Sequence, residues 1–212
     1  SLPKRMRSEI VVATKIPPKN FIWPASPRTR ARDIFPREWM IRATETSLRR
    51  MGLECVHLQQ LHVFTPRWAQ EEEWQAAFDA LRAKGKIILR GVSLTEHRPD
   101  DGLELVRRNL VDVIQVIHNV FDQGAERRLF PLARKHGVGI LTRVPLDEGS
   151  LAGRLTPETK FPSHDFRRRY FQGRRLAETC RRLEALRPVL VQGRVKTMEE
   201  GALRYCLSRP AC

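Results

Sequence analysis

The chain has 212 residues, which is enough for one sizeable domain with a complete hydrophobic core. Hydrophobic residues make up 41% and charged residues 30%, and no apolar run is long enough to cross a bilayer, so a disordered chain and a membrane-spanning protein are excluded. The formal net charge of +15 creates a positive field that favours anionic ligands.

Strand and helix patterns alternate from the first apolar run onward. Residues 9–15 (EIVVATK) contain β-branched side chains and precede a Pro-Pro break, which predicts a strand. Residues 17–36 are rich in proline, arginine and aromatic side chains, and we expect a long lid or binding loop there. An apolar stripe over residues 37–51 predicts a helix, with Gly52 as its cap, and residues 54–62 (ECVHLQQLH) read as a second, buried strand.

The same alternation continues through the rest of the chain. Helices are predicted at residues 70–84, 98–109, 125–136, 176–186 and 198–207, strands at 86–93, 111–118 and 138–144, and loops at 146–171 and 191–196. Apolar strands that alternate strictly with helices predict a parallel sheet covered by helices.

Two ways of arranging such a sheet fit the pattern, an open doubly wound sheet and an eight-stranded barrel. The dinucleotide fingerprint GxGxxG follows none of the predicted strands, and the phosphate loop GxxxxGK[ST] is also absent from the sequence, which favours the barrel. Five strands cannot close a barrel. The pattern by itself therefore leaves the arrangement of the sheet open.

Two ionisable side chains end two of the predicted strands. Lys15 closes the first strand and His62 closes the second, and active sites of parallel α/β folds lie at the carboxyl edge of the sheet. The alternative for Lys15 is an exposed lysine at a strand end, and for His62 a buried histidine whose hydrogen bonds are made by the backbone. His57 lies at the opposite parity to His62, so we interpret it as structural.

Six segments together resemble the aldo-keto reductase family, in order and spacing, over nearly the whole chain. They are VVATK, SLRRMGLECVHLQQLH, GKIILRGVS, VDVIQVIHNVFDQ, LARKHGVGILTRVPLDEGSLAG and EGALRYCLSRPAC. The sequence RVPLDEGSL, in place of the commoner YSPL, resembles a bacterial-type subgroup. The resemblance implies barrel strands three to seven, with both ends of the barrel missing from this chain. We therefore expect an incomplete (β/α)8 TIM-barrel type fold, with residues 1–212 as a single partial domain.

The family reduces aldehydes and ketones to alcohols by hydride transfer, and the resemblance implies that NADPH, or alternatively NADH, binds at the carboxyl face of the barrel. Its acid-base group is a tetrad of Asp, Tyr, Lys and His. Lys15 matches the lysine, which would lower the pKa of the tyrosine, and His62 matches the histidine, which would hold the substrate oxygen. The Asp and Tyr would lie before Ser1, and the eighth strand after Cys212.

Ser93 and Gln115 match the serine and glutamine that bond the nicotinamide carboxamide in this family. Leu94 stands where the family usually has Asn, which removes one carboxamide partner. Arg143 stands at the position of the aromatic residue that stacks on the nicotinamide ring; a guanidinium plane can stack there but would repel an oxidised ring.

The stretch after Arg143 matches the loop that wraps the cofactor pyrophosphate, where backbone N–H groups would bind anionic oxygens. The expected cofactor-binding residues of this stretch are Pro145, Leu146, Gly149, Ser150 and Leu151. Asp147 and Glu148 place negative charge beside the expected phosphates, so their carboxylates must point away. The alternative is an ordinary surface turn.

The resemblance and the composition also set expectations for partners. A small carbonyl substrate is expected, with its identity set largely by the loops at 17–36 and 155–171, and no membrane or metal partner. Four scattered cysteines without a CxxC motif indicate reduced thiols in a cytoplasmic protein. The arginines of 167–169 and 174–175 flank two aromatic residues and form the best local binding patch, although we do not expect nucleic acid.

One alternative remains beside the reductase. The 212 residues would then be a catalytically inactive barrel fragment that acts as a binding or interaction protein, because the family's tyrosine is not among them. Open sheet edges would allow such a fragment to associate with itself.

Overall fold

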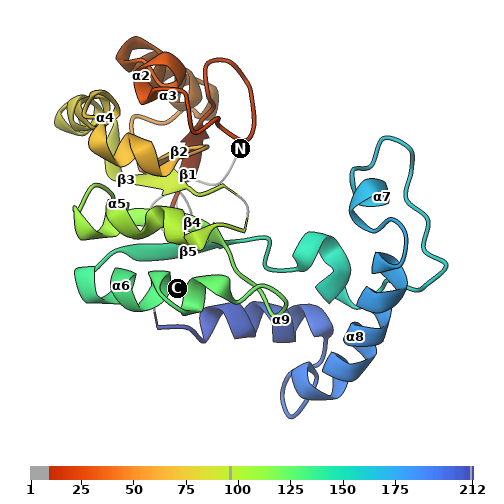
Figure 1. Cartoon of the computed structure of the whole chain (residues 1–212). Coiled ribbons are helices and arrows are strands. Elements are labelled where there is room, and N and C mark those ends of the chain that lie inside the picture. Colours follow the sequence, from red (N-terminus) through yellow and green to blue (C-terminus); the bar gives the residue numbers. More distant parts are fainter. Residues whose placement is uncertain (1–9, 96, 211) are drawn as a thin grey trace. The chain divides into compact units, whose positions relative to one another are not determined.

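The computed structural model describes residues 10–95, 97–210 and 212, which form two compact units (Figure 1). Unit 1 holds the residues up to Val116 together with Gly124–Leu141, and unit 2 holds Ile117–Gln123 and Thr142–Pro210. Over the described residues, none of the helices combines the length and the apolar character that crossing a bilayer would require.

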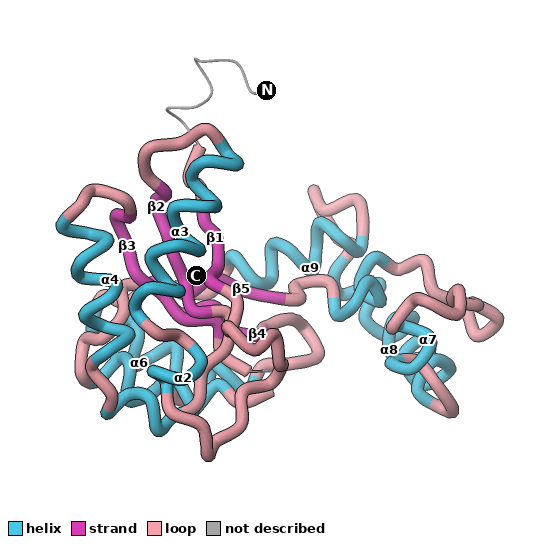
Figure 2. Tube along the Cα trace, turned by 90° about the horizontal axis from the view of Figure 1, so that it is seen from above, coloured by secondary structure: helices cyan, strands magenta, loops and turns pink. Residues whose placement is uncertain are grey.

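Five strands form one parallel sheet in the order in which they follow along the chain (Figures 1 and 2). The strands are β1 (Ala13–Ile16), β2 (Val56–Leu61), β3 (Ile87–Ser93), β4 (Val113–Ile117) and β5 (Gly139–Arg143). Sequential order with helical crossovers is the arrangement of a (β/α)8 barrel, and it confirms the predicted incomplete barrel rather than a doubly wound sheet, whose strand order reverses.

Helices connect consecutive strands, as the alternating pattern predicts. Unit 1 contains α2 (Ala31–Ile34), α3 (Arg37–Met51), η1 (Pro66–Gln70), α4 (Glu73–Ala83), η2 (Pro99–Gly102), α5 (Leu103–Arg107), η3 (Gly124–Glu126) and α6 (Leu129–His136). Unit 2 contains η4 (Asp147–Ala152), α7 (Arg167–Tyr170), α8 (Arg175–Leu190) and α9 (Met198–Leu207).

Several helix boundaries differ from the predicted ones for local reasons. The predicted helix at 98–109 begins as the 3-10 turn η2, which has a proline in its first turn, and becomes α-helical only at Leu103. The expected loops at 17–36 and 146–171 also contain short helices, α2 in the first and η4 and α7 in the second. The predicted strand at 9–15 begins at Ala13; its first residue, Glu9, lies outside the described residues.

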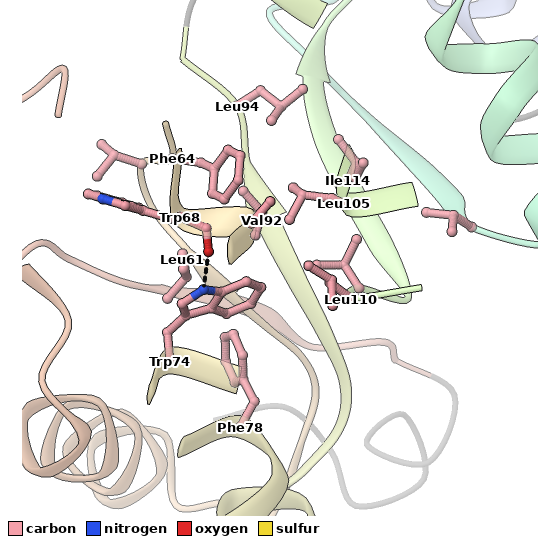
Figure 3. Packing of buried hydrophobic residues seen from close by; sticks show 14 of the residues in the cluster. Leu61, Phe64, Trp68, Trp74, Phe78, Val92, Leu94, Leu105, Leu110 and Ile114 are labelled. Carbon is pink, nitrogen blue, oxygen red and sulfur yellow. Dashed lines mark hydrogen bonds between the residues drawn. The ribbon is translucent and has the colours of Figure 1, made fainter. Parts of the chain in front are cut away.

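The core of unit 1 is built around aromatic side chains from the segment between β2 and β3 (Figure 3). Trp68, Trp74 and Phe78 are fully buried, and the indole N–H of Trp74 donates to the Trp68 carbonyl oxygen over 2.8 Å. Because each buried aromatic ring removes a large apolar area from water, this cluster holds η1 and α4 against the sheet.

The strand register sorts side chains onto the two faces of the sheet. Lys15 lies opposite Gln60, Ile16 opposite Leu61, and Ser93 opposite Gln115. On one face, the side chains are apolar and fully buried in the core: Ile16, Leu61, Val92 and Ile114. Successive strand residues point to opposite faces, so Lys15, Gln60, Ser93 and Gln115 lie together on the other face, which we call the polar face.

Unit 2 has a smaller apolar core of its own. Leu151 of η4 packs with Leu183 of α8 and with Met198 and Ala202 of α9. Gly201 allows α9 to approach the end of α8, because a Cβ atom there would lie 2.7 Å from the Leu190 carbonyl oxygen. The predicted helix at 198–207 is confirmed at both ends, and its N-cap residue Thr197 accepts the N–H of Glu200.

Candidate active site

Lys15 and His62 lie at the carboxyl ends of neighbouring parallel strands. The N–H of His62 donates to the Ile16 carbonyl oxygen over 3.0 Å, which continues the β1–β2 pairing one residue past β2. Lys15 is opposite Gln60, and His62 is two residues further along the same strand direction, so the three residues share the polar face of the sheet. Lys15 is half-buried and His62 is exposed.

Ser93 and Gln115 are paired on the same face, two strands further along. Both are buried, and the Oε1 atoms of Gln60 and Gln115 accept no hydrogen bond from any part of the chain that the structure describes. A buried acceptor without a donor is costly, and a ligand amide N–H would satisfy it. These side chains therefore fit a carboxamide such as that of nicotinamide.

Gln60 was not among the predicted site residues. The sequence signal for it was a pair of glutamines inside an otherwise apolar strand. Gln59 points to the helical layer, where its Nε2 donates to Thr44 Oγ1 on α3 over 3.1 Å, while Gln60 lies on the polar face. There it lies opposite Gly91 of β3 and packs over it. A Cβ atom on Gly91 would lie 3.0 Å from Gln60 Cγ and 2.8 Å from the Val113 carbonyl oxygen.

Leu94 faces away from the polar side chains. Its N–H donates to the Gln115 carbonyl oxygen over 2.8 Å, and its side chain is 1% exposed. The Leu94 Cδ1 atom reaches to 2.9 Å from the position that a Cβ atom on Gly102 would occupy, so Leu94 packs under η2. Leucine at this position belongs to the core and cannot act as a carboxamide partner.

The loop at 17–36 brings aromatic rings to His62. Trp23 lies edge-on to the His62 imidazole, with ring centroids 5.5 Å apart. Phe21 contacts both Trp23 and Trp39, and the Trp39 indole N–H donates to the Pro17 carbonyl oxygen over 2.8 Å. Trp23 is 46% exposed, so an aromatic surface borders the imidazole. The loop itself was predicted from its length, but not this contact.

His57 is placed by the backbone, as expected for a structural histidine. Its Nδ1 accepts the N–H of Val12 over 3.0 Å, and it lies on the opposite face from Gln60 and His62. This hydrogen bond links the His57 side chain to the backbone just before β1 and so supports the pairing of β1 with β2.

Within unit 2, Arg143 ends β5, and its carbonyl oxygen accepts the N–H of His118 over 3.2 Å. Val144 follows with φ 57°, a left-handed value that is rare for a β-branched residue. The Asn119 side chain holds this turn by donating from Nδ2 to the Val144 carbonyl oxygen over 2.9 Å. The chain is therefore turned sharply just before Pro145 and Leu146.

The carboxylate of Asp147 is occupied by two hydroxyl groups. Ser150 Oγ donates to Oδ2 over 2.7 Å, and Tyr170 Oη donates to Oδ1 over 2.9 Å. Burial, the hydrogen bond to Asp147 and the negative charge of that carboxylate raise the pKa of Tyr170 to about 12. The tyrosine therefore stays protonated. The two hydroxyl groups stabilise the negative charge of the Asp147 carboxylate by donating hydrogen bonds to it.

The turn of η4 uses its own N–H groups. Those of Gly149 and Leu151 both donate to the Leu146 carbonyl oxygen, over 2.9 and 3.1 Å. Glu148 and Gly149 both have left-handed backbone angles, with φ 53° and 93°. To contact a pyrophosphate as expected, the Gly149 and Leu151 N–H groups would have to break these hydrogen bonds to Leu146 and donate to the phosphate oxygens instead.

A sequentially ordered parallel sheet with polar side chains toward its carboxyl edge is the architecture of (β/α)8-barrel enzymes, whose active sites lie at that edge. The chain belongs to the aldo/keto reductase family, whose sequence profile matches residues 2–212. This confirms the family that the six segments indicated, with its bacterial-type subgroup.

Individual relatives are distant. The chain is 25% identical over 166 residues to the NADH-specific methylglyoxal reductase of Escherichia coli (strain K12), covering 74% of this chain and 49% of that protein. It is 28% identical over 167 residues to an NADP(+) aldo-keto reductase of Schizosaccharomyces pombe, covering 77% and 47%. The glycerol dehydrogenase structure from Gluconobacter oxydans superposes with a TM-score of 0.73 at 26% identity, covering 97% of this chain and 63% of that one. The chain spans about half the length of these curated relatives.

Proposed function

We propose that this chain carries part of the active site of an NAD(P)H-dependent reductase that converts a small aldehyde or ketone to an alcohol. The observation that carries the proposal is the shared face of Lys15, Gln60, His62, Ser93 and Gln115, which lies toward the carboxyl ends of four consecutive strands. Membership of the aldo/keto reductase family supports this reaction class.

Each side chain has a role that its chemistry suits. Lys15, held as an ammonium, would lower the pKa of the family's tyrosine and so make it an effective proton donor near neutral pH. His62 would donate a hydrogen bond to the substrate oxygen, on which negative charge develops. The exposed imidazole beside the Trp23 ring is reachable by a small substrate.

A nicotinamide cofactor would supply the hydride. Ser93 and Gln115 would hold its carboxamide, since the buried Gln115 Oε1 offers an acceptor to the amide N–H and Ser93 offers a hydroxyl donor. NADPH is our first candidate and NADH the second; relatives of this chain include one named for each cofactor.

The proposal is tested by titrating the purified chain with NADPH and with NADH while following tryptophan fluorescence, because Trp23 borders His62. We expect saturable quenching by at least one cofactor, and reduction of a small aldehyde such as methylglyoxal by the protein that contains the family's tyrosine. Failure of both cofactors to bind would overturn the proposal and would favour an inactive binding fragment.

The Trp23 ring suggests a preference among substrates. We expect Trp23→Ala to raise KM for aldehydes that carry an apolar substituent more than it lowers kcat, because the ring borders the imidazole that would hold the carbonyl oxygen. Met51→Ala is the control, since it also removes an exposed apolar side chain, but from the last residue of α3, before β2 begins.

A further inference from the structure

Unit 2 contains a pocket that none of the proposed catalytic or nicotinamide contacts uses. It has a volume of about 570 Å³ and is lined by Phe166, Arg169, Tyr170, Gln172 and Arg175, at the junction of α7 and α8. We call it the arginine pocket. Its volume falls in the range of pockets that hold small ligands.

One wall of the arginine pocket is fixed in place. The guanidinium carbon of Arg175 lies 3.7 Å from the centroid of the Tyr170 ring, and the edge of Phe171, with centroids 4.8 Å apart, supports the same ring. Tyr170 is also anchored at its hydroxyl by Asp147. Because a stacked guanidinium keeps its N–H donors in the plane parallel to the ring, Arg175 can present them edge-on to a ligand.

The positive charge of the arginine pocket is not neutralised locally. Within the part of the chain that the structure describes, Arg169 and Arg175 form no ion pair, and neither do their neighbours Arg168 and Arg174. Three carboxylates of this region are engaged with other groups: Asp165 binds Arg167 over 2.6 Å, Asp147 accepts the Tyr170 and Ser150 hydroxyls, and Glu178 pairs with Arg182. Several unpaired cations in so short a stretch repel one another, and an anion relieves this repulsion.

The pocket also has an apolar side. The Phe166 ring is 61% exposed although it lines the cavity, so it has a face on which a flat group can stack. A ligand that matches both sides carries an oxyanion for the two guanidinium groups and a flat ring for Phe166. Phosphate suits guanidinium donors well because it accepts two parallel N–H hydrogen bonds.

We propose that the arginine pocket binds a phosphate monoester attached to a flat, largely apolar body. Such a phosphate could belong to the cofactor or to a separate ligand such as the substrate. The proposal stands apart from the reductase proposal, because the binding of a phosphate ester in unit 2 requires neither Lys15 nor His62.

The test uses phenyl phosphate as the probe and isothermal titration calorimetry of the whole chain. We expect Arg169→Gln and Arg175→Gln each to weaken binding by at least about tenfold, since each removes a charge-assisted hydrogen bond. Arg168→Gln and Arg174→Gln are the matched controls: they remove the same charge from adjacent positions that do not line the pocket, and they should change affinity less than about threefold. Thermal unfolding of each variant checks that it is folded.

A second comparison separates the two sides of the pocket. Phe166→Ala should weaken phenyl phosphate several-fold and leave the binding of inorganic phosphate unchanged. Displacement of phenyl phosphate by NADP(+) would support the site and assign the phosphate to the cofactor, whereas simultaneous binding would support it and assign the phosphate to a separate ligand.

Three results would overturn the proposal. One is an absence of phenyl phosphate binding. Another is an equal loss in the pocket variants and the controls, which would indicate diffuse surface charge. The third is a chain that binds a single-stranded oligonucleotide but not phenyl phosphate. If that binding weakens steeply with salt, the arginines form a nucleic-acid surface instead.

Discussion

The N–H of His62 donates to the carbonyl oxygen of Ile16, the residue after Lys15, over 3.0 Å. This one backbone hydrogen bond ties together the ends of β1 and β2 at the level of the two predicted tetrad residues. Because pairing continues to the last residue of both strands, the positions of Lys15 and His62 along the strand direction are set by the register of the sheet and not by a loop.

Replacement of Lys15 tests the assignment of the acid-base group. In the reductase that contains the family's tyrosine, we expect Lys15→Met to lower kcat by about a hundredfold or more, because the tyrosine loses the neighbouring ammonium that lowers its pKa. Lys19→Met is the control, since Lys19 is an exposed lysine four residues away in the loop. Steady-state kinetics with saturating cofactor would measure both, and equal activity of the two variants would remove Lys15 from the mechanism.

The two faces of the sheet predict different effects on cofactor affinity for two buried glutamines. Gln115→Leu removes a buried acceptor that has no donor, so the free energy of unfolding should stay the same or rise, while cofactor affinity falls by about tenfold. Gln59→Leu removes the hydrogen bond to Thr44 but also a buried acceptor without a donor, so its effect on stability should be small, and cofactor affinity should not change. Denaturant unfolding and calorimetric titration distinguish the two, and an affinity loss confined to Gln59→Leu would contradict the placement of the cofactor.

Gly91 marks where neighbouring strands leave no room for a side chain. Gly91→Ala would put its Cβ atom 2.8 Å from the Val113 carbonyl oxygen, so we expect a loss of about 1–3 kcal/mol in the free energy of unfolding from overpacking. Gly139→Ala is the matched control on β5, where the nearest atom would be at 3.5 Å, an ordinary contact distance. Chemical denaturation of both variants provides the measurement, and similar stability for the two would disprove the close approach.

The raised pKa of Tyr170 makes a prediction for alkaline pH. The ordinary tyrosine value is 10.0 and the folded value is about 12, so the folded state holds this proton more tightly than the unfolded state. The stabilising contribution is therefore complete below pH 10 and is lost as the pH rises from about 10 to about 12.

Spectroscopic titration of tyrosinate absorbance tests this value. We expect the late-titrating component to disappear in Tyr170→Phe, leaving the chain's other tyrosine, Tyr205. Asp147→Asn should move the Tyr170 pKa down toward its ordinary value, because the amide carries no negative charge to oppose tyrosinate. If Asp147→Asn leaves the pKa of Tyr170 unchanged, burial alone is the cause.

Local signals in the sequence were sufficient for the helices whose ends are capped. The helix at 37–51 has the predicted bounds because Gly52 adopts the left-handed cap at φ 64°, and the helix at 198–207 does so because Thr197 caps its start. The starts of the helices that follow β2 and β3 were less accurate, since Pro66 and Pro99 open 3-10 turns ahead of the α-helical turns.

By itself, the sequence determined the alternation of strands and helices and the parallel sheet, because hydrophobic periodicity and helix caps are encoded by residues close together in the chain. The family was indicated by the resemblance of six ordered segments. Only the tertiary structure decided that Gln60 joins Lys15, that Trp23 borders His62, and that Tyr170 binds Asp147 from 23 positions away. These pairings depend on strand register and on how loops return to the sheet. Register and loop paths are set by packing between distant segments, which no local pattern records.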